Sequence, residues 1–489
     1  MSEPTPPSRS DRIPGRHFVA GAGASADRVL DSAQGRVFRL LWLFLPEPDI
    51  ARNLWFQHLL ASRFLTEAAQ QALVFGSAVS VAREGGSALQ VALVGVAAIL
   101  PPALLGMYGG AVAHTLPVRI ALAGAYTGQA LLCILIPAIF GTELGAVVVL
   151  LLLVNTLAQV SAPTESSVLP LLASEEEMAT AASLINLAAA AGSAFGIAVL
   201  APVMVKAFGV EQMFYAAGFV LFLSATRVFD LPVGDKAWTL RFQPPPARIR
   251  AMVRWIVRHP AVLTMIVVSV LAGTVNIVLV TLAPQYVSEV LDTDPADTAY
   301  VFAPTALGTV TALVVAPFMI RRWSERVAAV VGLAFSAVTL FLLGDIDAVA
   351  NVIDTVNPFG VPNRLGLDLS PELRATALLA IPVAFGVALT ATSVQTYINR
   401  RVPLTLQGRT FAMQSSLRNG AAIIPLVVLG AAASSFGVEA VLLVSPLLLL
   451  AMGYLLIAVS FRFSGVAQHS TLRVMETFWE EPASAPIER

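Results

Sequence analysis

Apolar residues run through this chain in long, nearly uninterrupted stretches that are separated by short polar turns. Most stretches approach the roughly 20 residues that a helix needs to cross the hydrocarbon core of a bilayer. A helix satisfies its own backbone hydrogen bonds, as a chain in lipid requires. The pattern predicts twelve membrane-spanning helices, at about 54–82, 88–113, 119–140, 144–161, 178–205, 212–231, 261–288, 298–319, 327–344, 375–399, 409–436 and 438–461.

Composition supports the same interpretation. Hydrophobic residues make up 57% of the chain and charged residues only 12%, against about 25% charged residues in an ordinary soluble domain. The mean hydropathy is +0.77. These values exclude a soluble multidomain protein, and the expected fold class is an all-α polytopic membrane protein.

Residues that enzymes and metal sites use are sparse. The five histidines are scattered, Cys133 is the single cysteine, and the sequence contains no phosphate-binding Gly-Lys-Ser/Thr loop. The net charge of −1 gives no reason to expect a nucleic-acid partner. We therefore expect neither an enzyme nor a protein with a cofactor or metal.

The basic residues predict the orientation in the membrane, because cytoplasmic loops carry an excess of Lys and Arg. Of the 30 Lys and Arg residues, 24 fall in alternate segments that include both termini, and four fall in the opposite loops. The remaining two, Arg63 and Arg418, lie within predicted spans. The count places both termini in the cytoplasm and the protein in a bacterial inner membrane.

The longest predicted cytoplasmic connection divides the spans into six plus six. Segment 232–260 carries a basic amphipathic stretch, in which Ile249, Met252, Val253 and Ile256 share one helix face. The apolar stretch 37–45 is too short to cross and predicts an interfacial helix or a helix packed on the protein's cytoplasmic face. The predicted domains are a cytoplasmic segment with this helix (1–53), a six-helix bundle (54–231), the linker (232–260), a second six-helix bundle (261–461) and a cytoplasmic tail (462–489). A long, acidic outside loop, 345–374, is expected to be a solvated loop or a lid.

A direct repeat supports the division. Residues 170–189, PLLASEEEMATAASLINLAA, align without a gap with residues 403–422, PLTLQGRTFAMQSSLRNGAA. The repeat places Asn186 and Asn419 at equivalent positions, where they are expected to contribute to helix packing. Parallel six-helix repeats are the arrangement of major facilitator transporters.

The sequence resembles the major facilitator superfamily over about residues 54–461, and within it the bacterial branch around the enterobactin exporter and the macrolide-efflux proteins. The most specific segment is QTYINRRVPLTLQGRTFAMQSSLRN, 395–419, and its counterpart is SAPTESSVLPLLASEEEMATAASLIN, 161–186. The resemblance implies two six-helix bundles around a central cavity. It also implies alternating access and ion-coupled movement of small solutes, often export.

The loop between spans two and three departs from the family pattern G-x-x-x-D-R-x-G-R-[KR]. Gly110 and Arg119 remain, but His114 replaces the acid and Pro117 replaces the second glycine. The acid helps to latch the cytoplasmic gate in the family, so the latch is in doubt here. The basic residues Arg409 and Arg418 of the corresponding region in the second half are further gate candidates.

Span five keeps small residues where antiporters of the family carry Gly-Pro. Gly192 and Gly196 are spaced at i and i+4, which allows close helix packing. The missing proline weakens the assignment as an antiporter without excluding it.

Ionisable groups within the spans are the first candidates for function, because a charge at the bilayer centre costs about 2.5–3.5 kcal/mol on insertion scales. Arg63 and Glu67 lie at i and i+4 on span one. We expect either that Glu67 carries a proton with Arg63 tuning it, or that the two form a structural ion pair. Arg418 is expected to act at a gate or surface rather than in solute binding.

Amides and hydroxyls on spans one, four, seven and ten complete the candidate cavity. A wall of amides with one carboxylate favours an amphipathic or weakly cationic small-molecule solute, with protons and the lipid bilayer as further partners. We expect a secondary transporter for proton-coupled efflux of amphipathic compounds or siderophore-like metabolites. A nutrient importer or uniporter, or a transporter-like protein with a partner or sensor role, are the alternatives. The candidate cavity residues are Gln70, Gln71, Asn155, Gln159, Asn276, Gln285, Thr392, Gln395 and Asn399.

Overall fold

The structure is a computed structural model of the whole chain, and it describes residues 50, 53–106, 117–173, 177–229, 256, 259–356, 370–402 and 404–463. Residues 58–489 form one compact unit, and residues 1–57 form another. Every interaction considered below lies within residues 58–489.

The described part of the chain is helical throughout. The first half contains α2 (Leu54–Arg83), α3 (Ala88–Leu105), α5 (Val118–Phe140), α6 (Leu144–Leu172), α7 (Met178–Phe195), the π-helical turn η2 (Gly196–Leu200), α8 (Ala201–Ala207) and α9 (Val210–Phe229). The second half contains α11 (Pro260–Glu289), η4 (Pro295–Asp297), α12 (Thr298–Val301), α13 (Thr305–Trp323), α14 (Glu325–Gly344), α15 (Ile346–Val356), α17 (Pro371–Arg401), α18 (Leu404–Phe436) and α19 (Val438–Phe463).

Eleven helical segments among the described residues are long and apolar enough to cross a membrane. α7, η2 and α8 join to form one of them, and η4, α12 and α13 form another. α2 is the twelfth long helix, with 30 residues, and its polar residues make it less apolar. The prediction of about twelve spans in an all-α membrane protein is therefore confirmed.

Two helices differ from the predicted pattern. α6 continues to Leu172, well past the predicted end of span four at about 161. The outside loop begins with α15, whose Ile346 and Ala350 pack against Ala375 of α17. This contact explains why the short segment α15 is helical, since short helices depend on packing of an apolar face.

Several predicted segments lie outside the described residues. They include the interfacial helix at 37–45, the loop with Gly110 and His114, and the C-terminal tail. Ile256 is the only residue that the structure describes between 249 and 258, the main part of the predicted amphipathic linker helix. Ile256 is 2% exposed and belongs to the apolar core of the second half, so at this residue the helix face packs on protein.

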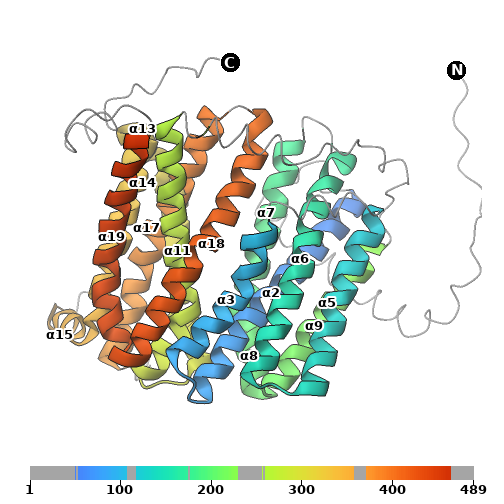
Figure 1. Cartoon of the computed structure of the whole chain (residues 1–489), viewed down its shortest axis with the longest axis horizontal. Coiled ribbons are helices and arrows are strands. Elements are labelled where there is room, and N and C mark those ends of the chain that lie inside the picture. The colour runs from blue at the N-terminus through green and yellow to red at the C-terminus, as the bar shows by residue number, and fades with distance from the viewer. Residues whose placement is uncertain are drawn as a thin grey trace, which may run out of the picture. The chain divides into compact units, whose positions relative to one another are not determined.

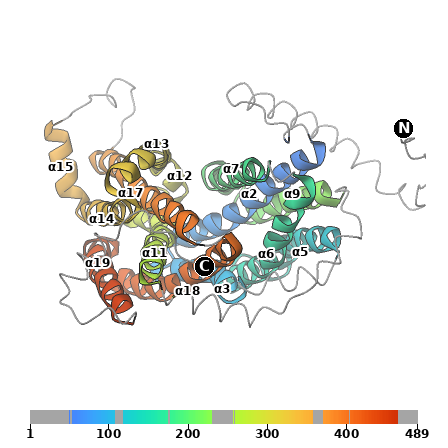
Figure 2. The same ribbon diagram turned by 90° about the horizontal axis from the view of Figure 1, so that it is seen from above.

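The two groups of helices meet along α3 and α18, which lie side by side (Figures 1 and 2). Small residues allow this approach: a Cβ added at Gly95 would lie 2.5 Å from the Thr281 methyl and 2.8 Å from Leu426 Cδ2. A Cβ added at Gly430 would lie 2.5 Å from the Ala92 Cβ. Close backbone packing of this kind holds helices together where lipid provides no hydrophobic drive.

Contacts between the halves are unevenly distributed along the spans. We call the end where α2 finishes and α3 begins the Arg83 end, and the end where α17 finishes the Arg401 end. At the Arg83 end, α8 and η2 contact η4 and α12. Over the described residues, α7 and α13, which continue the same spans toward the Arg401 end, are not in extensive contact.

Candidate functional site

Four polar side chains follow one face of α2. Arg63, Glu67, Gln70 and Gln71 recur at helical spacing, and each is partly exposed. The next section of the helix toward the Arg83 end is almost entirely buried. The polar face therefore belongs to the section of α2 nearer the Arg401 end.

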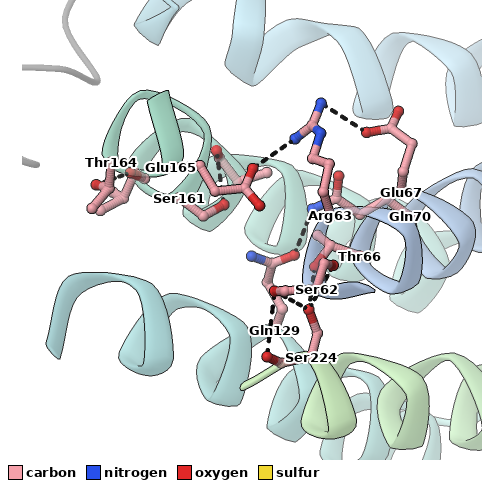
Figure 3. Close-up of polar contacts among 12 residues, drawn as sticks. Ser62, Arg63, Thr66, Glu67, Gln70, Gln129, Ser161, Thr164, Glu165 and Ser224 are labelled. Carbon is pink, nitrogen blue, oxygen red and sulfur yellow. Dashed lines mark hydrogen bonds and ion pairs between the residues drawn. The ribbon is translucent and has the colours of Figure 1, made fainter. Parts of the chain in front are cut away.

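Arg63 forms ion pairs with two carboxylates at once (Figure 3). Its Nη2 lies 3.1 Å from Glu67 Oε2 on the same helix, and its Nη1 donates to Glu165 Oε2 of α6 at 3.0 Å. The side chains of Arg63, Glu67 and Glu165 are 25%, 18% and 7% exposed. With both carboxylates ionised, the Arg63 cluster (Arg63, Glu67 and Glu165) carries a net charge of −1.

Sequence reasoning missed Glu165. The apolar run of span four ends near Ala162, so Glu165 was expected in the following loop, and the cavity was expected to contain one carboxylate. Because α6 continues to Leu172, Glu165 remains within the helix and faces α2. The cluster therefore holds two carboxylates, and its second one comes from a different helix.

Amide hydrogen bonds extend the cluster. Gln71 donates to Glu67 Oε1 at 3.3 Å, and Gln70 donates to Gln129 Oε1 of α5 at 2.8 Å. Gln129 is fully buried. These bonds orient the polar face of α2 toward α5 and α6, as Figure 3 shows for Gln70 and Gln129.

Buried hydroxyls beside this polar face fix α2 to α9. The Ser224 hydroxyl lies 2.8 Å from the Ser62 hydroxyl and 2.5 Å from the Thr66 hydroxyl, and it donates to the Ser62 carbonyl at 2.9 Å. All three side chains are at most 2% exposed. A satisfied buried network of this kind rigidifies a helix pair, and here it holds the helix that carries Arg63 and Glu67.

Span five packs its glycines directly behind Glu67. A Cβ added at Gly192 would lie 2.4 Å from the Phe64 carbonyl oxygen and 3.1 Å from Glu67 Cβ. One at Gly196 would lie 2.3 Å from the Ala68 carbonyl oxygen. The π-helical turn begins at Gly196, and such turns often occur at functional sites.

The amides of α6 are partly buried and bond to their own helix. Asn155 donates to the Leu151 carbonyl at 2.9 Å, and Gln159 donates to the Asn155 carbonyl at 3.2 Å.

The candidates of the second half fall into two sets. Asn276 on α11 and Gln395 and Asn399 on α17 are exposed, and Thr392 is partly exposed. Gln285 is 4% exposed and donates to Glu289 on the next turn of α11. Gln285 therefore lies toward the Arg83 end, apart from the exposed set.

The gate and packing candidates are only partly described. Arg119 is partly exposed at the start of α5, and Arg409 lies in α18 with its side chain outside the described set. Asn419 is 8% exposed, whereas its repeat counterpart Asn186 is exposed. The repeat thus places the two asparagines equivalently along the chain but in different surroundings.

Two ion pairs join the halves at the Arg83 end. Arg83 Nη2 lies 3.3 Å from Asp294 Oδ2, and Lys206 pairs with Asp297. The Lys206 ammonium also lies 5.9 Å from the centre of the Tyr300 ring, within range of a cation–π contact. Arg83 and Lys206 are two of the four basic residues that the sequence places in the outside loops.

A bundle of membrane-spanning helices with a charged cluster on α2 and α6 and exposed amides on α11 and α17 is an arrangement that a membrane transporter would use. The chain belongs to the Major Facilitator Superfamily, whose family model matches residues 59–424. The fold is therefore the major facilitator fold, and the solute is a small molecule. No curated protein matched the chain in a sequence comparison.

Solved structures with the same fold move different solutes. A variant of the nucleoside transporter NupG is 13% identical, with a TM-score of 0.65, over 83% of this chain and 99% of that one. A bacterial homologue of the human lysosomal transporter Spinster, in an inward-facing and occupied conformation, is 10% identical, with a TM-score of 0.61, over 89% and 100%. A variant of the peptide transporter POT is 16% identical, with a TM-score of 0.58, over 83% and 95%. At such low sequence identities, these similarities show only that the fold is shared.

Proposed function

We propose that this protein is a proton-coupled secondary transporter that exports small amphipathic compounds or siderophore-like metabolites, as in the enterobactin-exporter and macrolide-efflux branch. It works by alternating access in a bacterial inner membrane, with both termini in the cytoplasm. The observation that carries the proposal is the pairing of Arg63 with both Glu67 and Glu165 inside the bundle.

The charges of the cluster provide a reason for proton coupling. One guanidinium neutralises one of the two carboxylates, so uptake of one proton brings the cluster to neutrality. Glu67 is the more exposed of the two carboxylates, and we assign it as the proton carrier. Glu165 is the more buried carboxylate and lies beside the Tyr126 side chain, and it positions Arg63 when Glu67 is protonated.

Proton uptake changes the contacts of α2. Without a charge on Glu67, Arg63 is held by Glu165 of α6 alone, so the balance between two arrangements of the helices changes. A charge change that biases a two-state element is the general form of such switches. The glycines of span five that pack behind Glu67 would transmit the change to α7.

The contacts between the halves support alternating access. Ion pairs and small-residue packing hold the halves together at the Arg83 end, while α7 and α13 are not in extensive contact in the described part of the chain. The Arg83 end is the predicted external side, so this arrangement corresponds to access from the cytoplasm. The exposed amides of α11 and α17 then supply the solute-binding wall.

The test is efflux from a bacterium that lacks its own major pumps. Cells expressing the full chain are loaded with a cationic or an anionic amphipathic fluorescent dye, and loss of dye is followed with and without a protonophore. We expect protonophore-sensitive loss from wild-type cells and none from Glu67→Gln or Glu165→Gln at equal protein levels. Glu84→Gln is the matched control, because Glu84 lies beyond the end of α2 and away from the cluster. Efflux that survives both cluster variants would remove the cluster from the coupling mechanism.

A further inference from the structure

Arg418 lies at the middle of the second half, contrary to the expectation of a position near the membrane surface. It is close to the centre of α18 (Leu404–Phe436) and inside the candidate span 410–436. Its side chain contacts Gly273, which is near the centre of α11 (Pro260–Glu289). Two long helices that meet near their midpoints place this guanidinium deep in the bundle.

Gly273 provides the space for the Arg418 side chain. A Cβ at position 273 would lie 2.1 Å from Arg418 Cδ and 2.5 Å from its Cγ. The aliphatic part of Arg418 therefore lies directly against the α11 backbone. Its Nη2 makes one long hydrogen bond, to the Ser415 hydroxyl at 3.4 Å.

Arg418 and Arg63 differ in how their charges are balanced. Arg63 pairs with two carboxylates, whereas Arg418 has no Asp or Glu within ion-pairing distance among the described residues. Arg418 is also exposed. A charge at this depth costs about 2.5–3.5 kcal/mol on insertion scales, and such residues almost always face the bundle interior or a water-filled cavity and mark substrate or ion pathways.

The neighbouring contacts show which way Arg418 faces. Ser416, on the other side of α18, donates to the Ala103 carbonyl of α3 at 2.7 Å. Gln414, one turn before Arg418, bonds to Ser269 of α11. Arg418 therefore lies on the α11 side of α18, away from the α3 contact, and the exposed Asn276 is one turn further along α11.

The small-residue packing between α3, α11 and α18 lies just beyond this level. Thr281 of α11 and Leu426 of α18 pack on Gly95 of α3, two turns from Gly273 and from Arg418 toward the Arg83 end. Arg418 is thus the last charged side chain on α18 before this packing layer. The equivalent position of the first half is Ile185, so the site is charged on one side only.

We propose that Arg418 is the anion-recognising residue of the solute site, and that the solutes are amphipathic molecules that carry one carboxylate or similar monoanionic group. The guanidinium offers donors in a planar fork that matches a carboxylate. The apolar remainder of the solute would lie along the aliphatic walls of α11 and α18. The proposal rests on the proposed function as a transporter with a central site, and it revises the expected preference for an amphipathic or weakly cationic solute.

The first test measures the charge of the site without transport. Cys133 is the only cysteine, so Cys133→Ala with Asn276→Cys gives a full-length chain with one reporter thiol. In purified protein, the thiol is labelled with an anionic and a cationic methanethiosulfonate reagent. A positive charge a few ångströms away in a partly shielded site raises the labelling rate of the anionic reagent several-fold and lowers that of the cationic reagent several-fold. We expect the anionic-to-cationic rate ratio to fall by about tenfold on Arg418→Gln.

Two controls accompany this measurement. Arg418→Lys keeps the charge and should retain most of the ratio, which separates loss of charge from loss of folding. Arg401→Gln removes a charge at the Arg401 end and should leave the ratio unchanged. An unchanged ratio on Arg418→Gln, or a thiol at 276 that neither reagent reaches, would overturn the proposal.

A second arm tests the solute class with the same protein. 4-Phenylbutyrate should slow labelling of the 276 thiol when Arg418 is present, and 4-phenylbutylamine at the same concentration should not. Protection by the amine alone, or by neither compound, overturns the assignment of an organic acid. Neither arm uses a proton gradient. Efflux that survives Glu67→Gln and Glu165→Gln would therefore not affect the labelling result, and a negative labelling result would not affect the assignment of the coupling residues.

Discussion

The two ion pairs between the halves should hold the Arg83 end closed. Asp294→Asn combined with Asp297→Asn removes both pairs and leaves the local fold in place. Asp294 Oδ1 accepts the backbone N–H of Ala296 at 2.9 Å, and asparagine caps a helix as well as aspartate does. The double variant therefore isolates the charges.

The size of the effect follows from exposure. The Arg83 and Asp294 side chains are 43% and 32% exposed, and those of Lys206 and Asp297 are 36% and 31% exposed. Exposed pairs of this kind contribute about 0.2–1 kcal/mol each. Loss of both should raise the free energy of the closed arrangement relative to the open one by about 0.4–2 kcal/mol, a shift of roughly 2- to 30-fold in their ratio toward the open arrangement.

The shift can be measured as a distance distribution by double electron–electron resonance. Spin labels at Phe208→Cys and Phe436→Cys, in a Cys133→Ala chain, report from exposed sites on the two halves at the Arg83 end. We expect the longer-distance population to grow in the double variant. Glu325→Gln is the control, because Glu325 pairs with Arg400 within the second half. A distribution that is the same in wild type and double variant would refute the assignment of these pairs as a latch.

Three further predictions concern the packing around the two charged sites. Gly192→Ala should lower the free energy of unfolding of the purified protein by about 1–3 kcal/mol, because the added Cβ overpacks against α2. Gly124→Ala is the control and should be neutral, since a Cβ there meets nothing within 4 Å. Equal melting temperatures for the two variants would contradict the contact with α2. Gly273→Ala should reproduce the loss of anionic labelling preference of Arg418→Gln, because the added Cβ displaces the Arg418 side chain; a retained preference would show that the glycine is not needed. Ser224→Ala should destabilise the α2–α9 pair by about 1–2 kcal/mol in denaturant unfolding, since it removes the hydroxyl that the Ser62 and Thr66 hydroxyls share. Ser435→Ala should change little, because the Ser435 hydroxyl bonds to its own helix.

The polar face of α2 could be read from the sequence, but its partners could not. Arg63 and Glu67 are visible as an i, i+4 pair in an apolar stretch, and helical periodicity is enough to place them on one face. Glu165 follows the end of an apolar run, where hydropathy predicts a loop. Only the packing of α6 against α2 shows that its carboxylate shares Arg63 with Glu67.

The candidate amides show the same division. Sequence reasoning selected Asn276, Gln285, Gln395 and Asn399 by their helices alone. Gln285 lies toward the Arg83 end and is buried, whereas the other three are exposed. Hydropathy reports which residues are polar, but their access to solvent depends on how two distant parts of the chain meet.

By itself the sequence determined the class of protein, the approximate spans, the six-plus-six division and the rare charges within the spans. Each of these depends on local composition, because a helix in lipid satisfies its own backbone and needs only a sufficient apolar length. The tertiary structure decided which charges are balanced: Arg63 by two carboxylates from different helices, Arg83 and Lys206 across the halves, and Arg418 by none among the described residues. An ion pair between helices depends on their packing and register, and these are properties of the assembled bundle that no single span encodes.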